Sequence, residues 1–230
     1  MSKEVKLVIN NVTYEENVIF SLSTHRAAFS DFSKIVGNCV SGELYAVVNI
    51  PSASIPRNAE IKPYIRENNG AWVQKSTFYV FSREVDKITG YVTLTAYDAI
   101  FRTEQSFTQS GNQGSWPRKD IAVMQEIATR TNSTISSDAL AIIVNNYDVQ
   151  YPGITITDGT TTTYKPDGQG ALTMRDVAGR IAAMYGGSWF IDNNGQWRLW
   201  QLGVMPVDAD YLVTESHEII VMGGVRILVK

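Results

Sequence analysis

The sequence predicts an α+β fold that is mainly β, with barrel-like antiparallel modules and a few inserted helices. Apolar and polar residues alternate with period two through most of the first hundred residues, which is typical of half-buried strands. Two later windows have apolar residues three and four positions apart, as in helices, and an Asn-Gly pair between apolar runs indicates a hairpin. With 230 residues, 44% of them hydrophobic, the chain can bury its core as one large domain or two small ones.

The alternation is clearest over residues 43–50, where one face of the predicted strand carries Leu44, Ala46, Val48 and Ile50. Similar patterns recur over residues 59–67, 76–84 and 90–98, and strands at this spacing favour a barrel or a sandwich. Pro63 has no N–H to donate, so we expect its strand to lie at an edge or to carry a bulge. Turns between neighbouring strands are expected at Asn68-Asn69-Gly70 and Thr89-Gly90.

The pattern changes after Asp98, and we predict a first module over residues 1–107 and a second over residues 108–230. A helix is predicted near 117–130, with Ser115 as its cap and Pro117 in its first turn. Residues 137–144 fit a short helix or a strand equally well, and this alternative stays open. Residues 155–170 are rich in Thr, Gly and Asp, which fits an exposed loop or a hairpin tip.

The strongest local signals come near the end of the chain. A helix is predicted near 174–185, because Thr173 and Asp176 match a capping box and Gly186-Gly187 follows the apolar stripe. Two alternating runs around Asn194-Gly195 then predict a terminal hairpin. Residues 223–230 read as a closing apolar strand, and we expect the natural gene to continue beyond it.

Composition and charge argue against several protein classes. The chain has 20 Lys and Arg against 23 Asp and Glu, a net charge of −3, and no long basic run, which disfavours dedicated nucleic-acid binding. Charges within the first ten residues exclude a signal peptide there, and no segment approaches the roughly 18 apolar residues that a membrane span requires. We therefore expect a protein that is made and folded in the cytosol.

Cys39 is the only cysteine, so neither an internal disulfide nor a thiolate-rich metal site is available. A nucleophile would have to pair Cys39 with His25 or His217, but no recognised motif surrounds it, and a small buried residue is the favoured interpretation. His217-Glu218 lacks the second histidine of a zinc-binding helix and is expected at a surface turn. The glycines form no phosphate-binding pattern, and we expect no cofactor.

Carboxylate pairs that hydrolyse sugars are set by spatial separation, so the sequence leaves them open for Asp98, Glu104 and Glu126. The favoured interpretation is structural. Asp98 stands where a strand gives way to a helix and is expected to act as an N-cap, with Arg102 and Glu104 on a solvated face. We assign no catalytic residue and expect no enzymatic activity.

Three tryptophans, Trp189, Trp197 and Trp200, lie on the predicted terminal hairpin. An exposed row of indole rings could stack on sugar rings or nucleobases. Trp189 and Trp197 are instead expected to share one face and to be buried against the helix near 174–185, which favours core packing over a ligand platform.

The order of these segments resembles phage tail baseplate hub proteins, which include the hub of contractile tails and the N-terminal region of siphophage tail-associated lysins. The similarity covers most of residues 37–107 and 115–202. It is carried by the small-residue entry from Gly37 to Gly42, the segment Ile55-Pro-Arg-Asn-Ala59, the strand ending Ala96-Tyr-Asp98, and LTMRDVAGRIAAMYGGSWFIDNNGQWRLW. Residues 132–170 match nothing in that family, and no lysin or peptidase segment follows the hairpin.

The resemblance implies a virion structural protein with no catalytic residue, metal or cofactor. Its expected partners are copies of itself, as a homotrimer, with a tail tube or distal tail protein and a tail spike or lysin module. DNA would meet it only in transit, and no membrane is involved. A carbohydrate-binding or wall-hydrolysing tail tip module is the alternative. Strand-rich segments with polar, Thr-bearing outer faces fit a subunit whose sheet edges are completed by neighbouring chains.

Overall fold

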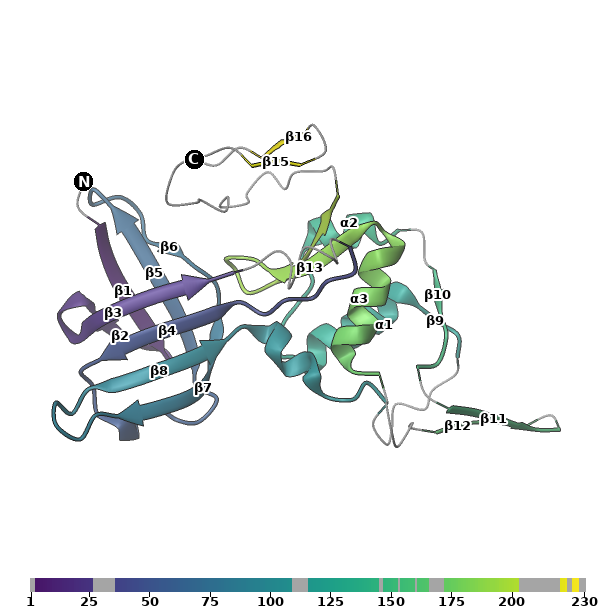
Figure 1. Cartoon of the computed structure of the whole chain (residues 1–230), viewed down its shortest axis with the longest axis horizontal. Coiled ribbons are helices and arrows are strands. Elements are labelled where there is room, and N and C mark those ends of the chain that lie inside the picture. Colours follow the sequence, from purple (N-terminus) through teal and green to yellow (C-terminus); the bar gives the residue numbers. More distant parts are fainter. Residues whose placement is uncertain are drawn as a thin grey trace.

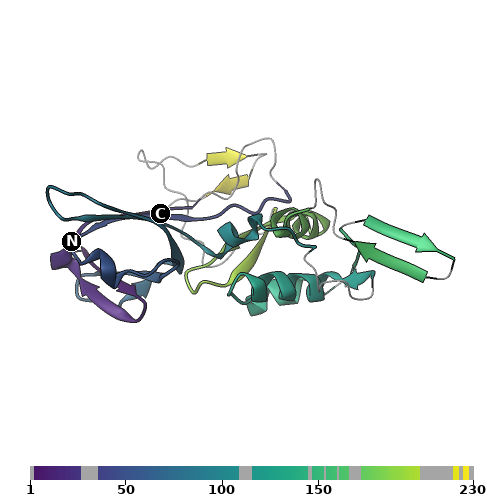
Figure 2. The ribbon, with the colours of Figure 1, turned by 90° about the horizontal axis from the view of Figure 1, so that it is seen from below.

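The computed structural model describes residues 3–26, 36–108, 116–144, 147–152, 154–159, 161–165, 172–202, 220–222 and 225–227. The fold is α+β and mainly β, as predicted, with a curled antiparallel sheet on one side and a helical half on the other (Figure 1). A thin hairpin projects from the helical half, away from the sheet, and the view from below shows the same arrangement (Figure 2).

The barrel-like sheet has eight strands in the order β2-β1-β5-β7-β8-β4-β3, with β6 paired to β5. All neighbouring strands are antiparallel, and β2 and β3 are the two end strands. The strands are β1 (Lys3–Ile9), β2 (Val12–Glu15), β3 (Ile19–His25), β4 (Glu43–Val48), β5 (Glu60–Glu67), β6 (Val73–Gln74), β7 (Phe78–Val85) and β8 (Val92–Tyr97). Short 3-10 turns, η1 (Glu16–Val18) and η2 (Ser52–Ser54), lie between strands.

The predicted alternation places the core of this sheet. Leu44, Ala46 and Val48 of β4 are fully buried, and so are their inward-facing counterparts on β8. Full burial of a Leu or Val side chain contributes about 1.5–3 kcal/mol. The core consists of residues drawn from five strands and from the connection between β4 and β5: Leu7, Ile9, Leu44, Ala46, Val48, Ile50, Ile55, Ala59, Ile61, Phe78, Val80, Val92, Leu94 and Ala96.

Pro63 does not lie on an edge strand, so the first of its two expected placements is wrong, and its strand instead carries an irregularity there. Its strand β5 pairs with β1 on one side and with β6 and β7 on the other. On that second side the ladder is interrupted at Pro63, because Ile61 pairs with Phe78 while Tyr64 pairs with Gln74. Two residues of β5 thus face the three residues 75–77, and the proline occupies the break between two neighbours, where no ladder N–H is needed.

The tight turns use asparagine in the left-handed region. Asn68 and Asn69 have φ of 49° and 58°, and Gly90 has φ of 75°, which confirms the predicted turns. Asn10 and Asn11, at φ of 47° and 66°, make the β1–β2 turn in the same way. Asparagine tolerates this conformation better than most residues, so these turns fix the hairpin registers locally.

The helical half begins with η3 (Ala99–Glu104). It contains α1 (Asp120–Arg130), α2 (Ser137–Ile142), α3 (Met174–Met184) and the strands β9 (Arg118–Lys119), β10 (Asp148–Val149), β11 (Ile154–Asp158), β12 (Thr161–Lys165), β13 (Gly187–Ile191) and β14 (Trp197–Gln201). Later in the chain come β15 (Ile220–Met222) and β16 (Val225–Ile227). Strands β9 to β16 form four separate two-stranded pairs. A second core, centred on the three α-helices and the β13–β14 hairpin, is held by Ile100, Phe107, Val123, Met124, Ile127, Val177, Ile181, Trp189 and Trp197, among others.

The helix starts differ in how well the sequence predicts them. Thr173 and Asp176 form the expected capping box at α3. The predicted start near residue 117 is wrong, because α1 begins at Asp120 and has Lys119 at its cap position. Arg118 and Lys119 pair with β10 as an extended segment, which keeps Pro117 out of the helix. Ser115 lies outside the described residues.

The open alternative for residues 137–144 resolves as helix α2, whose N-cap Ser136 accepts a hydrogen bond from the Ala139 N–H. Within residues 155–170, the described part forms the β11–β12 hairpin. The predicted terminal hairpin is confirmed as β13–β14, with Gly195 at φ of 78° in its turn. The predicted closing strand is described only over β16, which pairs with β15.

The two halves are joined by a backbone segment from the first half that lies along β13. The Gly37 N–H donates to the Gly187 carbonyl at 2.8 Å, and the Trp189 N–H donates to the Asn38 carbonyl at 2.8 Å. Cys39 forms a parallel bridge with Trp189. Residues 36–40 therefore extend the β13–β14 hairpin by a short third strand before the chain returns to the barrel at β4. The division into modules at residues 107 and 108 stays a prediction.

A second junction joins the break beside Pro63 to the β13–β14 turn. The Ser76 N–H donates to the Asn193 carbonyl at 3.1 Å, and the Ser76 hydroxyl donates to the Asp192 carbonyl at 3.0 Å. The Arg26 guanidinium links the Asn193 side chain to the Lys75 carbonyl, both at 3.0 Å. The irregular segment 75–77 thus provides polar groups that hold the two halves together.

We predict that Gly179→Ala destabilises the protein. The alanine Cβ would lie 2.4 Å from the Gly37 carbonyl oxygen, so α3 would have to move away from the joining segment. The expected loss in the free energy of unfolding is about 1–3 kcal/mol from overpacking, which outweighs the gain of about 1 kcal/mol in helix propensity. Urea denaturation measures it.

Arg180→Ala is the matched control, because Arg180 is exposed on the next position of the same helix. Its effect should stay within about 0.5 kcal/mol. A Gly179→Ala protein as stable as the wild type would contradict the close approach of the two backbones.

Candidate functional site

Asp98, the first candidate carboxylate, is a buried N-cap at the start of η3. Its side chain accepts hydrogen bonds from the Ile100 N–H at 3.0 Å, the Ser41 hydroxyl at 2.9 Å and the Gly42 N–H at 2.6 Å. The predicted capping role is confirmed. Asp98 also ties the end of β8 to the segment that enters β4, which the sequence did not indicate.

Burial dominates the electrostatics of this carboxyl. Desolvation raises the pKa of Asp98 to about 6, against the opposing effect of the hydrogen bonds from Gly42, Ser41 and Ile100 and of the Arg26 charge. A carboxyl with such a pKa could carry a proton near neutral pH. Its oxygens are nevertheless already engaged by three donors of the protein itself.

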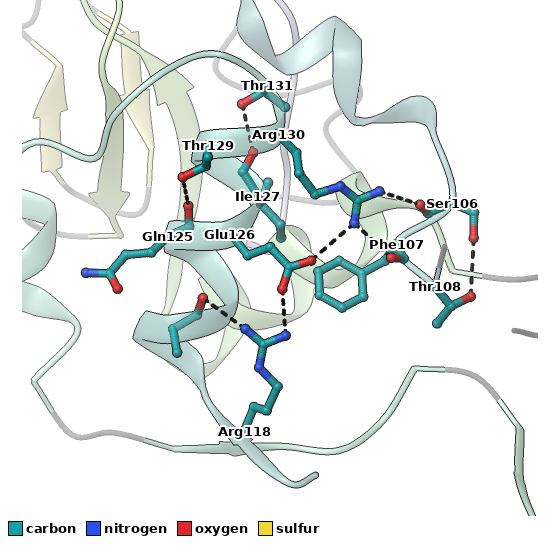
Figure 3. Close-up of polar contacts among 11 residues, drawn as sticks. Ser106, Phe107, Thr108, Arg118, Gln125, Glu126, Ile127, Thr129, Arg130 and Thr131 are labelled. Atoms are coloured by element: carbon teal, nitrogen blue, oxygen red, sulfur yellow. Dashed lines mark hydrogen bonds and ion pairs between the residues drawn. The ribbon is translucent and has the colours of Figure 1, made fainter. Parts of the chain in front are cut away.

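Glu126, on α1, lies between two arginines. Its carboxylate contacts the Arg118 guanidinium at 2.6 Å and the Arg130 guanidinium at 3.4 Å, and all three side chains are largely buried (Figure 3). Arg130 also donates to the Phe107 and Ser106 carbonyls at 2.8 and 2.9 Å. This network fastens α1 to the chain that follows η3, so Glu126 has a structural task.

Glu104 behaves differently from the other two carboxylates. Its side chain is about half exposed and forms an ion pair with Arg175 of α3 at 2.7 Å. The expected solvated position of Glu104 is thus correct. Asp98 and Glu104 line one groove, and Glu126 is not among the residues that line it. The structure therefore brings two of the three candidate carboxylates to a common surface.

That groove lies where the barrel meets η3 and has a volume of about 450 Å³. Three aromatic rings gather in it: Phe81 lies edge-on to Tyr97 and Phe101, at 5.5 and 5.2 Å, and Tyr97 stacks on Phe101 at 4.5 Å. Phe81 is 62% exposed. We call this groove, which is lined by the rings of Phe81, Tyr97 and Phe101, the aromatic groove.

A bulge in β7 explains why Phe81 points outward. Val80 pairs with Ala96 and Ser82 pairs with Thr95, which leaves Phe81 as an extra residue between them. Bulges of this kind redirect a side chain away from the regular alternation. In the wall of the groove, the Arg102 guanidinium lies 3.6 Å from the centre of the Tyr79 ring and donates to the Thr131 carbonyl. Sequence periodicity carries no signal for this cluster.

Of the cysteine and histidine candidates, the structure describes Cys39 and His25. Cys39 is buried, as predicted, and burial raises the pKa of its thiol far above the usual range, which disfavours the reactive thiolate. His25 is exposed at the end of β3. His217 lies outside the described residues, so its expected turn position is not described here.

The tryptophans of the hairpin pack as predicted. Trp189 and Trp197 are fully buried, with ring centres 5.9 Å apart. The Trp189 indole donates to the Ala178 carbonyl of α3 at 2.9 Å, and the Trp197 indole donates to the Thr131 hydroxyl. Trp200, on the opposite face, is partly buried. A ligand platform made from Trp189 and Trp197 is therefore excluded.

Within the described parts of the chain, no three His, Cys, Asp or Glu side chains lie close enough to hold a metal ion. The helices described are all too short or too polar to cross a membrane.

The remaining candidate surfaces are the two end strands of the barrel-like sheet. Among the described residues, β2 pairs with β1 alone and β3 pairs with β4 alone. Phe20, 55% exposed, stacks on Tyr91 at 4.2 Å beside the β3 edge. An edge strand carries backbone donors and acceptors that a further strand can pair with.

Neither known protein families nor curated proteins give a match to the sequence. Among solved structures, the chain is similar in fold to the 43 kDa tail protein of prophage MuSo2 from Shewanella oneidensis, with a TM-score of 0.51 and 12% identity over 95% of this chain and 61% of that one. The tail protein from Neisseria meningitidis MC58 has a TM-score of 0.51 and 13% identity over 93% and 55%. The chain thus shares their fold and spans less than two-thirds of their length.

The buried Asp98 carboxyl should make the stability of the protein depend on pH. Because the pKa of Asp98 is higher in the folded state than the usual 3.8, the folded state binds this proton more tightly. Its contribution to stability is therefore complete below pH 4 and is lost as the pH rises through 6. The free energy of unfolding of the wild type, relative to Asp98→Asn, should fall by about 1–3 kcal/mol between pH 4 and pH 7. Urea denaturation at several pH values measures this.

Asp86→Asn is the control with the opposite sign. Asp86 is exposed, and hydrogen bonds from Ile88 and Thr89 lower its pKa. The wild type should therefore gain stability relative to Asp86→Asn as the pH rises through the acid range. A difference between the wild type and Asp98→Asn that stays constant from pH 4 to pH 7 would show that Asp98 titrates normally.

Proposed function

We propose that the chain is a structural subunit of a phage or prophage tail, placed in the baseplate hub, where it joins the tail tube to the distal tip as a homotrimer. The observation that carries this proposal is the likeness of nearly the whole chain, 95% and 93%, to the folds of two tail proteins. The order of strand, helix and hairpin signals in the sequence supports the same family independently.

The end strands of the sheet support an assembly role. A barrel closed on itself has no edges, whereas this sheet ends in β2 and β3. Strand edges that face outward are suited to contacts between copies of a subunit. The proposed partners are further copies of the chain, a tail tube or distal tail protein, and a tail spike or lysin module. The proposed location is the virion, after synthesis in the bacterial cytoplasm, with DNA present only in transit.

The contacts of the candidate carboxylates favour a role without catalysis. Asp98 receives three hydrogen bonds that hold β4, β8 and η3 together, and Glu126 bridges two arginines within α1 and its approach. Removing either group from these contacts for a reaction would leave buried donors without acceptors. We therefore propose a structural protein and not an enzyme.

Carbohydrate binding at the aromatic groove is the second candidate function. Exposed aromatic rings beside polar side chains are what a sugar ring requires, and Asn58, Arg102 and Glu104 line the groove next to the rings. This placement differs from the one predicted on the terminal hairpin, where the tryptophans are buried. Such a subsite would serve recognition of the host wall by a tail tip module.

The proposed trimer is tested by the mass of the protein in solution. Light scattering of the purified chain should give a mass about three times 25.5 kDa, because unfilled strand edges in a tail subunit are completed by neighbouring copies. A chain that stays monomeric at all concentrations would contradict the proposed assembly.

The aromatic groove is tested separately by titration with oligosaccharides from bacterial cell walls, followed by NMR. Phe81→Ala should weaken binding by about tenfold, since the exposed ring supplies the stacking surface. Phe20→Ala removes a ring of similar exposure elsewhere on the sheet and serves as the control. Absence of wild-type binding, or equal loss in both variants, would eliminate carbohydrate recognition at this groove.

A further inference from the structure

The β3 strand has the properties of an edge made for pairing. Its seven residues, IFSLSTH, contain no Lys, Arg, Asp, Glu or Pro, and all but two are exposed. Proteins usually protect an outward edge with charge, proline or a very short strand. The other edge, β2, follows that rule, because it has only four residues and ends at Glu15. The two edges of the same sheet therefore differ in kind.

The β11–β12 hairpin is a two-stranded sheet that could be extended by a further strand. It projects from the helical half, and in the described part of the chain β12 pairs with β11 alone (Figure 1). A two-stranded hairpin by itself is at best marginally stable in water, so it gains from a further strand. The sequence of β12, TTTYK, is β-branched and aromatic, with one charge at its end.

These two elements cannot meet within one molecule. β3 belongs to the barrel-like sheet at one end of the long axis, and the β11–β12 hairpin extends from the opposite end, as both views show (Figure 1, Figure 2). A contact between them must therefore join two copies. Uncharged residues along most of both strands remove the usual electrostatic barrier to edge pairing.

We propose that β12 of one copy adds to the β3 edge of the next copy, so that the hairpin is an assembly arm. This contact is head-to-tail, because the two surfaces belong to opposite ends of the molecule, and a head-to-tail contact closes into a ring when the rotation between copies permits. The inference rests on the proposed trimer and names the contact that builds it. In this arrangement three arms and three β3 edges satisfy one another.

A photo-crosslinking residue in place of Thr163 tests the contact. Thr163 is the middle residue of β12, so it lies near the centre of β3 whether the strands pair parallel or antiparallel. Irradiation should give a cross-linked trimer, and mass spectrometry should locate the adduct within residues 19–25 of another copy. An adduct elsewhere, in a trimer that still forms, would overturn the proposed contact and leave the trimer intact.

Charge variants supply the matched comparison, read out by light scattering. Ser23→Asp with Thr163→Asp places like charges across the contact and should weaken assembly about tenfold or more, whereas Ser23→Lys with Thr163→Asp should assemble better than the like-charge pair. Thr13→Asp puts the same charge on the β2 edge and should have no effect. Equal assembly of both pairs would overturn the contact.

The oligomer size separates the two proposals. Adducts between position 163 and β3 in open series of two, four and more copies would support the edge contact and overturn the trimer. A protein that neither cross-links nor associates at any concentration would overturn both.

Discussion

The fold depends on the backbone contact between residues 36–40 and the helical half. Gly37 donates to Gly187 and lies against Gly179 of α3, at a separation that leaves no room for a side chain on Gly179. The same segment then enters β4, where Gly42 donates to the buried Asp98. One short stretch of small residues thus positions the barrel, α3 and the β13–β14 hairpin together, and the two cores cannot shift independently without breaking it.

The elements that the sequence predicts correctly are those set by neighbouring residues. Alternation along β4 and β8, the capping box at Thr173 and Asp176, and the turn at Gly195 each act over a few residues, so the physics that forms them is visible locally. The cap at Asp98 belongs to the same group. Its raised pKa does not, because burial in the folded chain raises that pKa, and the opposing hydrogen bonds from Ser41 and Gly42 come from residues more than fifty positions away.

The elements that the sequence misplaces are those set by distant partners. Pro63 lies inside the sheet because two different strands share one side of β5, and α1 begins three residues late because β10 pairs with the residues before it. Phe81 lines the aromatic groove because β7 has a bulge at this residue, and the alternation of apolar and polar residues in the sequence does not predict a bulge. Each case requires knowing which strand lies alongside, and tertiary pairing decides that.

The distribution of charge connects the fold to the proposed assembly. Ionisable groups at the centre of the molecule are engaged in internal contacts, as Glu126 is with Arg118 and Arg130, whereas β3 at one end of the molecule carries no charged residue. Ion pairs fasten elements within each half of the molecule, and the absence of charged residues along β3 permits β-strand addition at that edge. This arrangement supports the proposed role of a subunit whose β3 edge joins another copy of the chain.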